Sequence, residues 1–312
     1  MPSVKNVMTT SRIDHPVNVY FKTQFLRRAF PRMLHTLWGM ENPMPQHAGE
    51  VTKWRRYASP TAQTTPLVEG EDPSPVLQSK TDISAQVKPY GAFIKVSSWL
   101  DLTGMSADGA QRTDWLADQF KRTIDTLCRE TISATASTTT ASNGSPTATL
   151  VNRTDVETVT ETLLGNEAMY ITKNVSAGTG VGTAPVLPAF VGIMDTLLRN
   201  DVLNVSTFRH PNQYGSNVAE LPGEMGSITD VRIVLTTDGY VSGSNYRLTI
   251  IGQESYGNVK ISGADEMLIH LTPDQVGSPL KQYGTFGWKA NYACRILNDN
   301  WIHALIITRG SR

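Results

Sequence analysis

Residues 106–135 read SADGAQRTDWLADQFKRTIDTLCRETISAT and contain no proline. Within them, apolar residues recur at steps of four, four, three, one and four, which is the spacing of one helix face. These residues are Leu116, Phe120, Ile124, Leu127, Cys128 and Ile132. The residues predicted on the opposite, polar face are Asp114, Asp118, Lys121, Arg122, Asp125 and Arg129. The pattern predicts a single helix of about 30 residues, roughly 45 Å long, with its apolar face on the core.

The composition is balanced overall but uneven along the chain. With 312 residues, the chain can form one elaborate domain or two closely packed ones. Lysine and arginine total 28, as do aspartate and glutamate, so net charge implies no polyelectrolyte partner. Residues 1–57, however, carry nine basic and three acidic side chains, whereas residues 138–270 carry seven and thirteen. The basic segment is interpreted either as a solvated arm or as one that meets nucleic acid or an acidic neighbour.

The chemistry-bearing residues do not assemble into a recognisable active site. Cys128 and Cys294 stand in apolar stripes, which indicates buried, reduced thiols in a chain that folds in a cytoplasm. The six histidines show no metal-ligand spacing, and hydrolase, dinucleotide and phosphate-loop motifs are absent. No stretch of consecutive apolar residues reaches the length of about 18 that a membrane-spanning helix needs. We therefore expect no enzyme activity, no catalytic residue, no cofactor, no metal and no membrane partner.

The first third of the chain reads as two segments that need outside support. Residues 1–48 are predicted to form an extended arm with an aromatic stripe around Phe21 and Phe25. Residues 49–99 are predicted to form a long hairpin with a polar tip at residues 69–72 and a bend at residues 89–91. A two-stranded hairpin with few large apolar residues is not stable alone, so we expect neighbouring chains to brace it.

The remainder predicts a mixed α/β insert followed by a closing pair of strands. A helix is expected over residues 154–170, with its cap near Thr154 or Asp155, and strands alternate with a second helix at 195–202. Residues 288–296 alternate, residues 298–300 predict a turn, and residues 301–307 are apolar on both faces. We interpret this last part as a hairpin on which the long helix packs.

Six blocks of sequence resemble the coat-protein family that includes the phage N4 capsid protein. They are residues 45–57 (ending KWRRY), 65–70 (TPLVEG) with Pro73, 87–91 (VKPYG), 223–226 (GEMG), 255–257 (SYG) and 287–301 (beginning GWKA). The order of arm, long hairpin, long helix, mixed insert and closing strands likewise resembles the HK97-like fold of tailed-phage major capsid proteins. The step at residues 191–195 lacks the His-Pro expected in such coats, and residues 176–184 and 209–220 look like local variation.

The resemblance implies an α+β protein of the HK97-like capsid fold in five parts. These parts are an N-terminal arm (1–48), an E-loop β-hairpin (49–99), a peripheral domain with the spine helix at about 106–135 (100–150), an α/β axial domain (151–280) and returning strands of the peripheral domain (281–312).

The same resemblance implies a structural role. The chain is expected to self-assemble into hexamers and pentamers of an icosahedral head that encloses phage double-stranded DNA, in the virion, after assembly in the host bacterial cytoplasm. The implied partners are other copies of itself, a scaffolding protein, a portal protein, a decoration or cement protein, and packaged DNA at the inner surface. The alternatives are an encapsulin-type bacterial compartment of the same fold, a cytosolic enzyme and a nucleic-acid-binding module.

Candidate intersubunit contacts come from the aromatic and basic arm, the basic strand end of the hairpin and its acidic tip. They are Phe21, Phe25, Arg27, Arg28, Arg32, Trp54, Arg55, Arg56, Glu69, Glu71 and Asp72. We expect the arm arginines to contact an acidic neighbour or packaged DNA.

Overall fold

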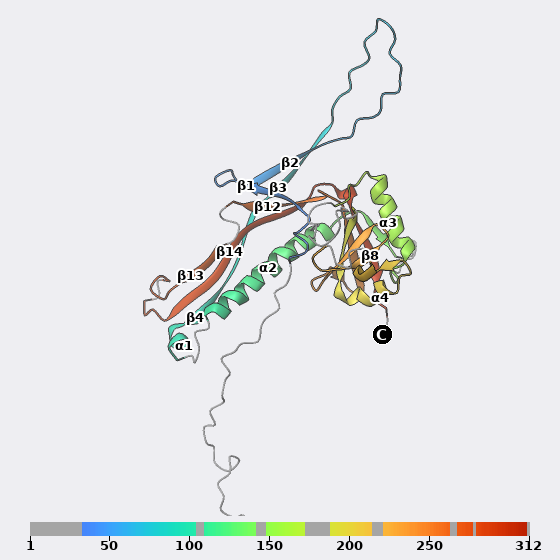
Figure 1. The fold of residues 1–312 in the computed structure, drawn as a ribbon. Helices are drawn as coiled ribbons and strands as arrows, with labels where there is room; N and C mark the ends of the chain where they lie inside the picture. The colour runs from blue at the N-terminus through green and yellow to red at the C-terminus, as the bar shows by residue number, and fades with distance from the viewer. Residues whose placement is uncertain are drawn as a thin grey trace, which may run out of the picture.

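A long sheet backed by one helix and a compact mixed lobe make up most of the molecule (Figure 1). The computed structural model describes residues 33–103, 109–141, 148–171, 188–213, 221–262, 267–276 and 279–310. A hairpin extends away from one end of the long sheet (Figure 1).

The long sheet has five strands. Their order is β1 (Met40–Met44), β12 (Tyr256–Ile261), β14 (Tyr283–Ile296) and β13 (Met267–Leu271), and β4 (Lys88–Ser97) pairs with the other edge of β14. β1 and β12 are parallel, and the other pairs are antiparallel. The helix α2 (Gly109–Ser133) runs along β14 on one face, and the short α1 (Ser98–Thr103) follows β4 at the far end (Figure 1).

The apolar seam of α2 is confirmed. Leu116, Ile124, Cys128 and Ile132 are buried and pack with inward-facing residues of β14. Those residues of β14 are Trp288, Ala290 and Tyr292. The Trp288 ring also meets Phe120 edge to face, with centroids 5.5 Å apart, a geometry that aromatic pairs favour. The polar face is wrong at two positions, because Asp118 and Asp125 are buried.

The compact lobe is built on an eight-stranded sheet. The order is β5 (Thr138–Thr140), β15 (Ile302–Thr308), β11 (Asn245–Ile251), β6 (Phe190–Asp195), β9 (Val231–Thr236), β8 (Glu224–Ile228) and β7 (Phe208–Arg209), with β10 (Val241–Ser242) on β11. β6–β9 and β5–β15 are parallel. Every residue of β6 is buried, as expected of a strand covered on both faces. The helices are α3 (Arg153–Gly165) and α4 (Arg199–Leu203), with short 3₁₀ turns η1 (Thr196–Leu198), η2 (Pro211–Gln213) and η3 (Asp299–Trp301).

The predicted closing hairpin is wrong. β14 and β15 follow each other in sequence but belong to different sheets: β14 pairs with β4, β12 and β13, whereas β15 pairs with β11 and β5. Between them, the Asn298 side chain caps η3 and turns the chain from one sheet to the other. The helix α2 therefore packs on β14 as predicted, whereas β15 adds only Ile302 to that core.

The division expected at residues 280/281 does not follow the sheets. β12 and β13 come from the 151–280 segment but lie in the helix-backed sheet, and β15 comes from the 281–312 segment but lies in the lobe. The chain thus passes from the lobe to the long sheet after β11 and returns after β14.

The predicted helix at residues 154–170 is shorter than expected. α3 begins one residue earlier, and its cap is Asn152, whose side chain accepts the Asp155 N–H at 2.9 Å. It ends at Gly165 and is capped by Asn166, and the next residue, Glu167, takes the left-handed conformation (φ 56°) that commonly follows a helix. The helix expected at 195–202 begins as η1, capped by Asp195, and continues as α4.

The hairpin of β2 (Val51–Tyr57) and β3 (Lys80–Gln86) is antiparallel, as predicted. The expected bend at residues 89–91 lies earlier, at Val87, where the chain leaves β2 and joins β14 as β4. The Val87 N–H donates to the Glu50 carbonyl at 2.9 Å, which fixes the turning point.

Candidate interaction surfaces

The base of the hairpin is anchored to its own chain. Trp54 packs with a small cluster that includes Val87 and Val259. A Cβ placed on Gly257 would lie 2.8 Å from the Trp54 ring, so only glycine permits this close approach. Trp54 therefore attaches the hairpin to β12 in the structure of this chain.

Arg55 and Asp82 pair across the two strands beyond this anchor. The Arg55 Nε donates to Asp82 at 2.8 Å, and this hydrogen bond lowers the pKa of the Asp82 carboxyl and raises that of Arg55. Both side chains are about half exposed, so solvent screens the pair. Arg56 is exposed as well, which leaves the strand end basic.

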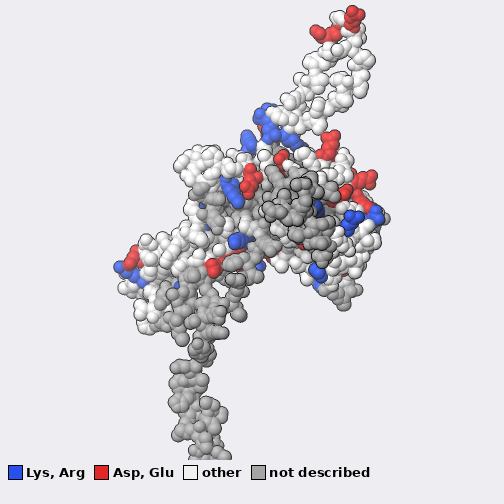
Figure 2. Space-filling view, viewed as in Figure 1, with Lys and Arg blue, Asp and Glu red and all other residues white. Residues whose placement is uncertain are grey.

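The segment between the strands, residues 58–79, is here named the excursion. All of its residues are exposed, and Figure 1 shows it as a long open loop. Its large apolar side chains are strongly exposed: Leu67 (74%), Val68 (64%), Val76 (63%) and Leu77 (91%). The acidic predicted residues Glu69, Glu71 and Asp72 lie between them and colour the far end red in Figure 2. Such an apolar loop is covered only if another molecule lies on it.

The face of the long sheet that points away from α2, here named the outer face, is also apolar. Phe93, Gly287 and Ile269 lie side by side in the register of β4, β14 and β13. Phe93 is 64% exposed, and Leu271 is exposed beside them. Because residue 287 has no side chain, a groove of about 410 Å³ opens between its neighbours.

Two lysines border this groove. Lys289 lines it, and Lys95 lies one pleat further along β4 on the same face, with its Nζ 5.0 Å from the Tyr283 ring centroid. The outer face therefore combines apolar side chains with positive charge, which complements the apolar and acidic excursion. Phe93 was missed at the sequence level, although a large aromatic residue on the polar side of an alternating strand is a usable signal.

The tip of the long sheet carries a second exposed apolar group. In α1, Trp99 is 73% and Leu102 is 81% exposed. This helix lies at the end of the molecule opposite the β2–β3 hairpin (Figure 1).

A buried polar network ties the segment before β1 to α2. The Asp125 carboxylate accepts the His35 N–H at 2.8 Å and contacts His35 Nδ1 at 2.7 Å. The His35 carbonyl accepts the Tyr256 hydroxyl at 2.5 Å and the Cys128 thiol at 3.1 Å. Burial raises the pKa of Tyr256, so this hydroxyl stays a donor. The network explains why Asp125 is buried on a face that reads as polar.

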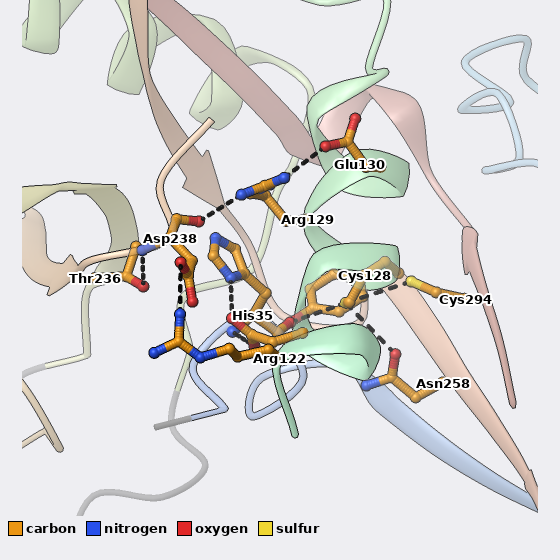
Figure 3. Close-up of polar contacts among 11 residues, drawn as sticks. His35, Arg122, Cys128, Arg129, Glu130, Thr236, Asp238, Asn258 and Cys294 are labelled. Atoms are coloured by element: carbon orange, nitrogen blue, oxygen red, sulfur yellow. Dashed lines mark hydrogen bonds and ion pairs between the residues drawn. The ribbon is translucent and has the colours of Figure 1, made fainter. Parts of the chain in front are cut away.

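Arginines of α2 face the loop after β9 in the lobe (Figure 3). Arg129 donates to the Asp238 carbonyl at 3.1 Å, and Arg122 lies between Asp118 and Asp238 at 3.6 and 4.0 Å. These contacts connect the helix to the compact lobe.

The structure places only some of the predicted contact residues, and these lie in two parts of the hairpin. Phe21, Phe25, Arg27, Arg28 and Arg32 lie outside the described residues. Trp54, Arg55 and Arg56 lie at the base of the hairpin, and Glu69, Glu71 and Asp72 lie in the excursion. His303 is buried, and its Nε2 lies 2.7 Å from Thr139 Oγ1.

Within the described ranges, no three His, Cys, Asp or Glu side chains are grouped to hold a metal ion. None of the helices in those ranges has the length and apolar character of a membrane span.

The fold matches solved phage capsids over nearly the whole chain. The capsid protein of cyanophage P-SCSP1u superposes with a TM-score of 0.67 at 12% identity, covering 99% of both chains. The capsid of Ralstonia phage GP4 gives 0.69 at 11% identity, covering 98% of this chain and 99% of that one. The mature capsid of bacteriophage PhiM1 gives 0.60 at 11% identity, covering 100% and 98%.

Sequence comparison adds no relative. No protein-family model matches the chain. No curated protein matches it either. The structural likeness confirms the predicted α+β, HK97-like capsid fold.

Proposed function

We propose that this chain is a structural major capsid protein, which self-assembles into hexamers and pentamers of an icosahedral head around double-stranded DNA. The observation that carries the proposal is a capsid fold whose excursion is exposed throughout and is not buried by the other described residues of the chain. The comparison structures are phage capsids that match this chain from end to end. The role is contact between copies and not catalysis, and the place of action is the virion.

Within this proposal, the excursion of one copy lies on the outer face of a neighbouring copy. Leu67, Val68, Val76 and Leu77 would enter the groove beside Phe93, where each gains burial that its own chain does not provide. Glu69, Glu71 and Asp72 would then approach Lys95 and Lys289. Arg55 and Arg56 would meet the rim of the same neighbour.

The other partners belong to the same proposal. Phe21 and Phe25 would lie across a neighbouring copy, and Arg27, Arg28 and Arg32 would contact an acidic neighbour or packaged DNA. A scaffolding protein, a portal protein and a decoration or cement protein would complete the head. The five named parts of the chain would serve as arm, E-loop, peripheral domain, axial domain and returning strands. The N4-like family also remains a proposal.

Particle size tests the proposal most directly. The full chain is expressed, and its product is sized by gel filtration and negative-stain microscopy. We expect closed particles tens of nanometres across, and a stable monomer or dimer at high concentration would contradict the proposal. Particles that contain protein cargo and no DNA in the native host would instead favour the encapsulin alternative.

A charge exchange tests the docking of the excursion. Lys95→Glu with Lys289→Glu should prevent assembly, because two like-charged surfaces then face each other. Adding Glu69→Lys, Glu71→Lys and Asp72→Lys should restore particles. Failure of the combined variant to assemble, although it is folded by circular dichroism, would refute this contact.

Charge reversal of Arg27, Arg28 and Arg32 should weaken assembly or genome retention, and unchanged particles would exclude their proposed role.

A further inference from the structure

Two thiols that are distant in sequence meet where α2 crosses β14. Cys128 lies near the end of the helix and Cys294 near the end of the strand, 166 positions apart. Their Sγ atoms are 3.4 Å apart, and both cysteines are free (Figure 3). A disulfide has an S–S distance of about 2.05 Å, so the sulfurs need to approach by little more than an ångström.

The surroundings hold the two sulfurs in this arrangement. The Cys128 thiol donates to the His35 carbonyl at 3.1 Å and lies 3.7 Å from Asn258 Oδ1. Asn258 is paired in register with Cys294 on the neighbouring strand and is itself fixed by hydrogen bonds to Tyr292 and Thr36. The thiols are therefore positioned by hydrogen bonds and strand register.

The two thiols differ in access. Cys128 is fully buried, whereas Cys294 is partly exposed. Cys294 is therefore the more accessible of the two to a small reagent, and Cys128 lies behind it. This is the arrangement of an attacking thiol with a resolving thiol behind it.

We propose that Cys128 and Cys294 form an intramolecular disulfide when the folded chain meets a low-molecular-weight disulfide, RSSR. The Cys294 thiolate attacks RSSR, which gives a mixed disulfide and a thiolate RS⁻ that takes up the proton. Cys128 then loses its proton and attacks the Cys294 sulfur, which releases the second RS⁻ as RSH. Overall, the two protein thiols are oxidised and RSSR is reduced to two RSH.

The second step has a built-in pH dependence. Burial raises the pKa of the Cys128 thiol well above its usual value, and Cys128 is still a free thiol at this step. Because the thiolate is the nucleophile, closure should be slow near neutral pH and speed up roughly tenfold per pH unit. In a reducing cytoplasm the pair stays open, and it closes once the chain is in an oxidising medium.

The disulfide would join the helix to the sheet that it covers. Closing a loop of this length restricts the unfolded chain, so the oxidised form should unfold roughly several degrees higher. If the chain is a capsid protein, as proposed above, the link would form after release of the particle from the cell. The chemistry itself does not depend on assembly.

The test uses the full chain incubated with oxidised glutathione or with dithiothreitol, then denatured and treated with a maleimide. We expect two maleimide adducts on the reduced chain and none on the oxidised one, with a Cys128–Cys294 linked peptide in the digest. Two adducts after oxidation, a persistent glutathione adduct on Cys294, or links between chains would each overturn the proposal.

Matched variants provide the controls. Cys294→Ser and Cys128→Ser each keep one thiol, so neither should gain thermal stability on oxidation. The shift in the wild-type unfolding midpoint should disappear when dithiothreitol is added back. Because thiols are counted whether or not particles form, failure of this proposal is distinguishable from failure of the proposed capsid function.

Discussion

The helix-backed sheet and the excursion follow opposite rules within one chain. Along α2, apolar residues such as Leu116 and Ile124 are at most 2% exposed, because β14 covers them. Along residues 58–79, apolar residues such as Leu77 are fully open to solvent. The two regions are connected through Trp54 and Val87, which anchor the hairpin to the long sheet.

The difference separates what folds the chain from what joins it to other copies. Burial in the first region contributes to the stability of each molecule by itself. The exposed apolar area of the excursion does not stabilise the isolated chain. Its burial free energy is gained only when another copy covers it, so it favours association. A substitution should therefore change either folding or assembly, according to the region in which it lies.

The largest effect is expected for four changes in the excursion: Leu67→Ser, Val68→Ser, Val76→Ser and Leu77→Ser. Each side chain would lose about 1.5 kcal/mol or more of burial in the assembled particle, and the losses add over four positions. We expect assembly to be abolished in gel filtration, while the thermal unfolding midpoint stays within error of the wild type. A matched set of exposed polar changes, Thr61→Ser and Thr65→Ser, should leave particles intact. Normal particles from the fourfold variant would place the intersubunit energy elsewhere.

The next effect concerns the core beneath α2. Ile124→Ala should lower the free energy of unfolding by about 3 kcal/mol, because the cavity left against β14 cannot fully collapse. Asp114→Ala on the exposed side of the same helix should change it by less than about 0.5 kcal/mol. Urea denaturation of the unassembled chain measures both. Equal losses for the two variants would mean that the helix is not held by this seam.

A similar loss is expected when the buried network is broken. Asp125→Asn replaces one of the two carboxylate oxygens that contact His35 with an NH₂ donor, so one buried His35 donor loses its acceptor and faces another donor, at a cost of about 3 kcal/mol. Asp114→Asn is the matched control, since that side chain is exposed. Guanidinium unfolding of both variants would decide the matter, and unchanged stability of Asp125→Asn would show that the network is dispensable.

Local patterns predicted what depends on local geometry. The steps of the α2 seam, the hairpin of β2 and β3 and the exposed tip all follow from periodicity and turn residues, which act over a few positions. Asp125 was wrongly predicted on the exposed face of the helix, because its partner, His35, is 90 positions away and the helix sequence does not indicate such a contact. The groove at Gly287 likewise requires the register of three strands, which periodicity does not supply.

The misassigned closing hairpin shows where a local signal was available. β14 alternates because only one of its faces is covered, whereas β15 is apolar on both faces because it lies inside the lobe. A strand with one open face alternates, whereas a strand covered on both faces is apolar throughout, so the contrast indicated that the two strands have different surroundings. A turn at Asn298 is compatible with a hairpin and with a change of sheet, so the turn residues could not distinguish the two.

The smallest effect lies inside the packed lobe and depends on pH. Burial lowers the pKa of His303 in the folded chain. The folded chain therefore binds a proton at His303 less readily than the unfolded chain, in which a histidine titrates at about pH 6.5. The stability that depends on a neutral His303 is therefore fully present above about pH 6.5 and is lost as the pH falls below it. His303→Gln keeps a polar group near Thr139 but cannot titrate. We expect the difference in unfolding free energy between wild type and variant to shift against the wild type below about pH 6.5, and parallel profiles would show that His303 is not the group responsible.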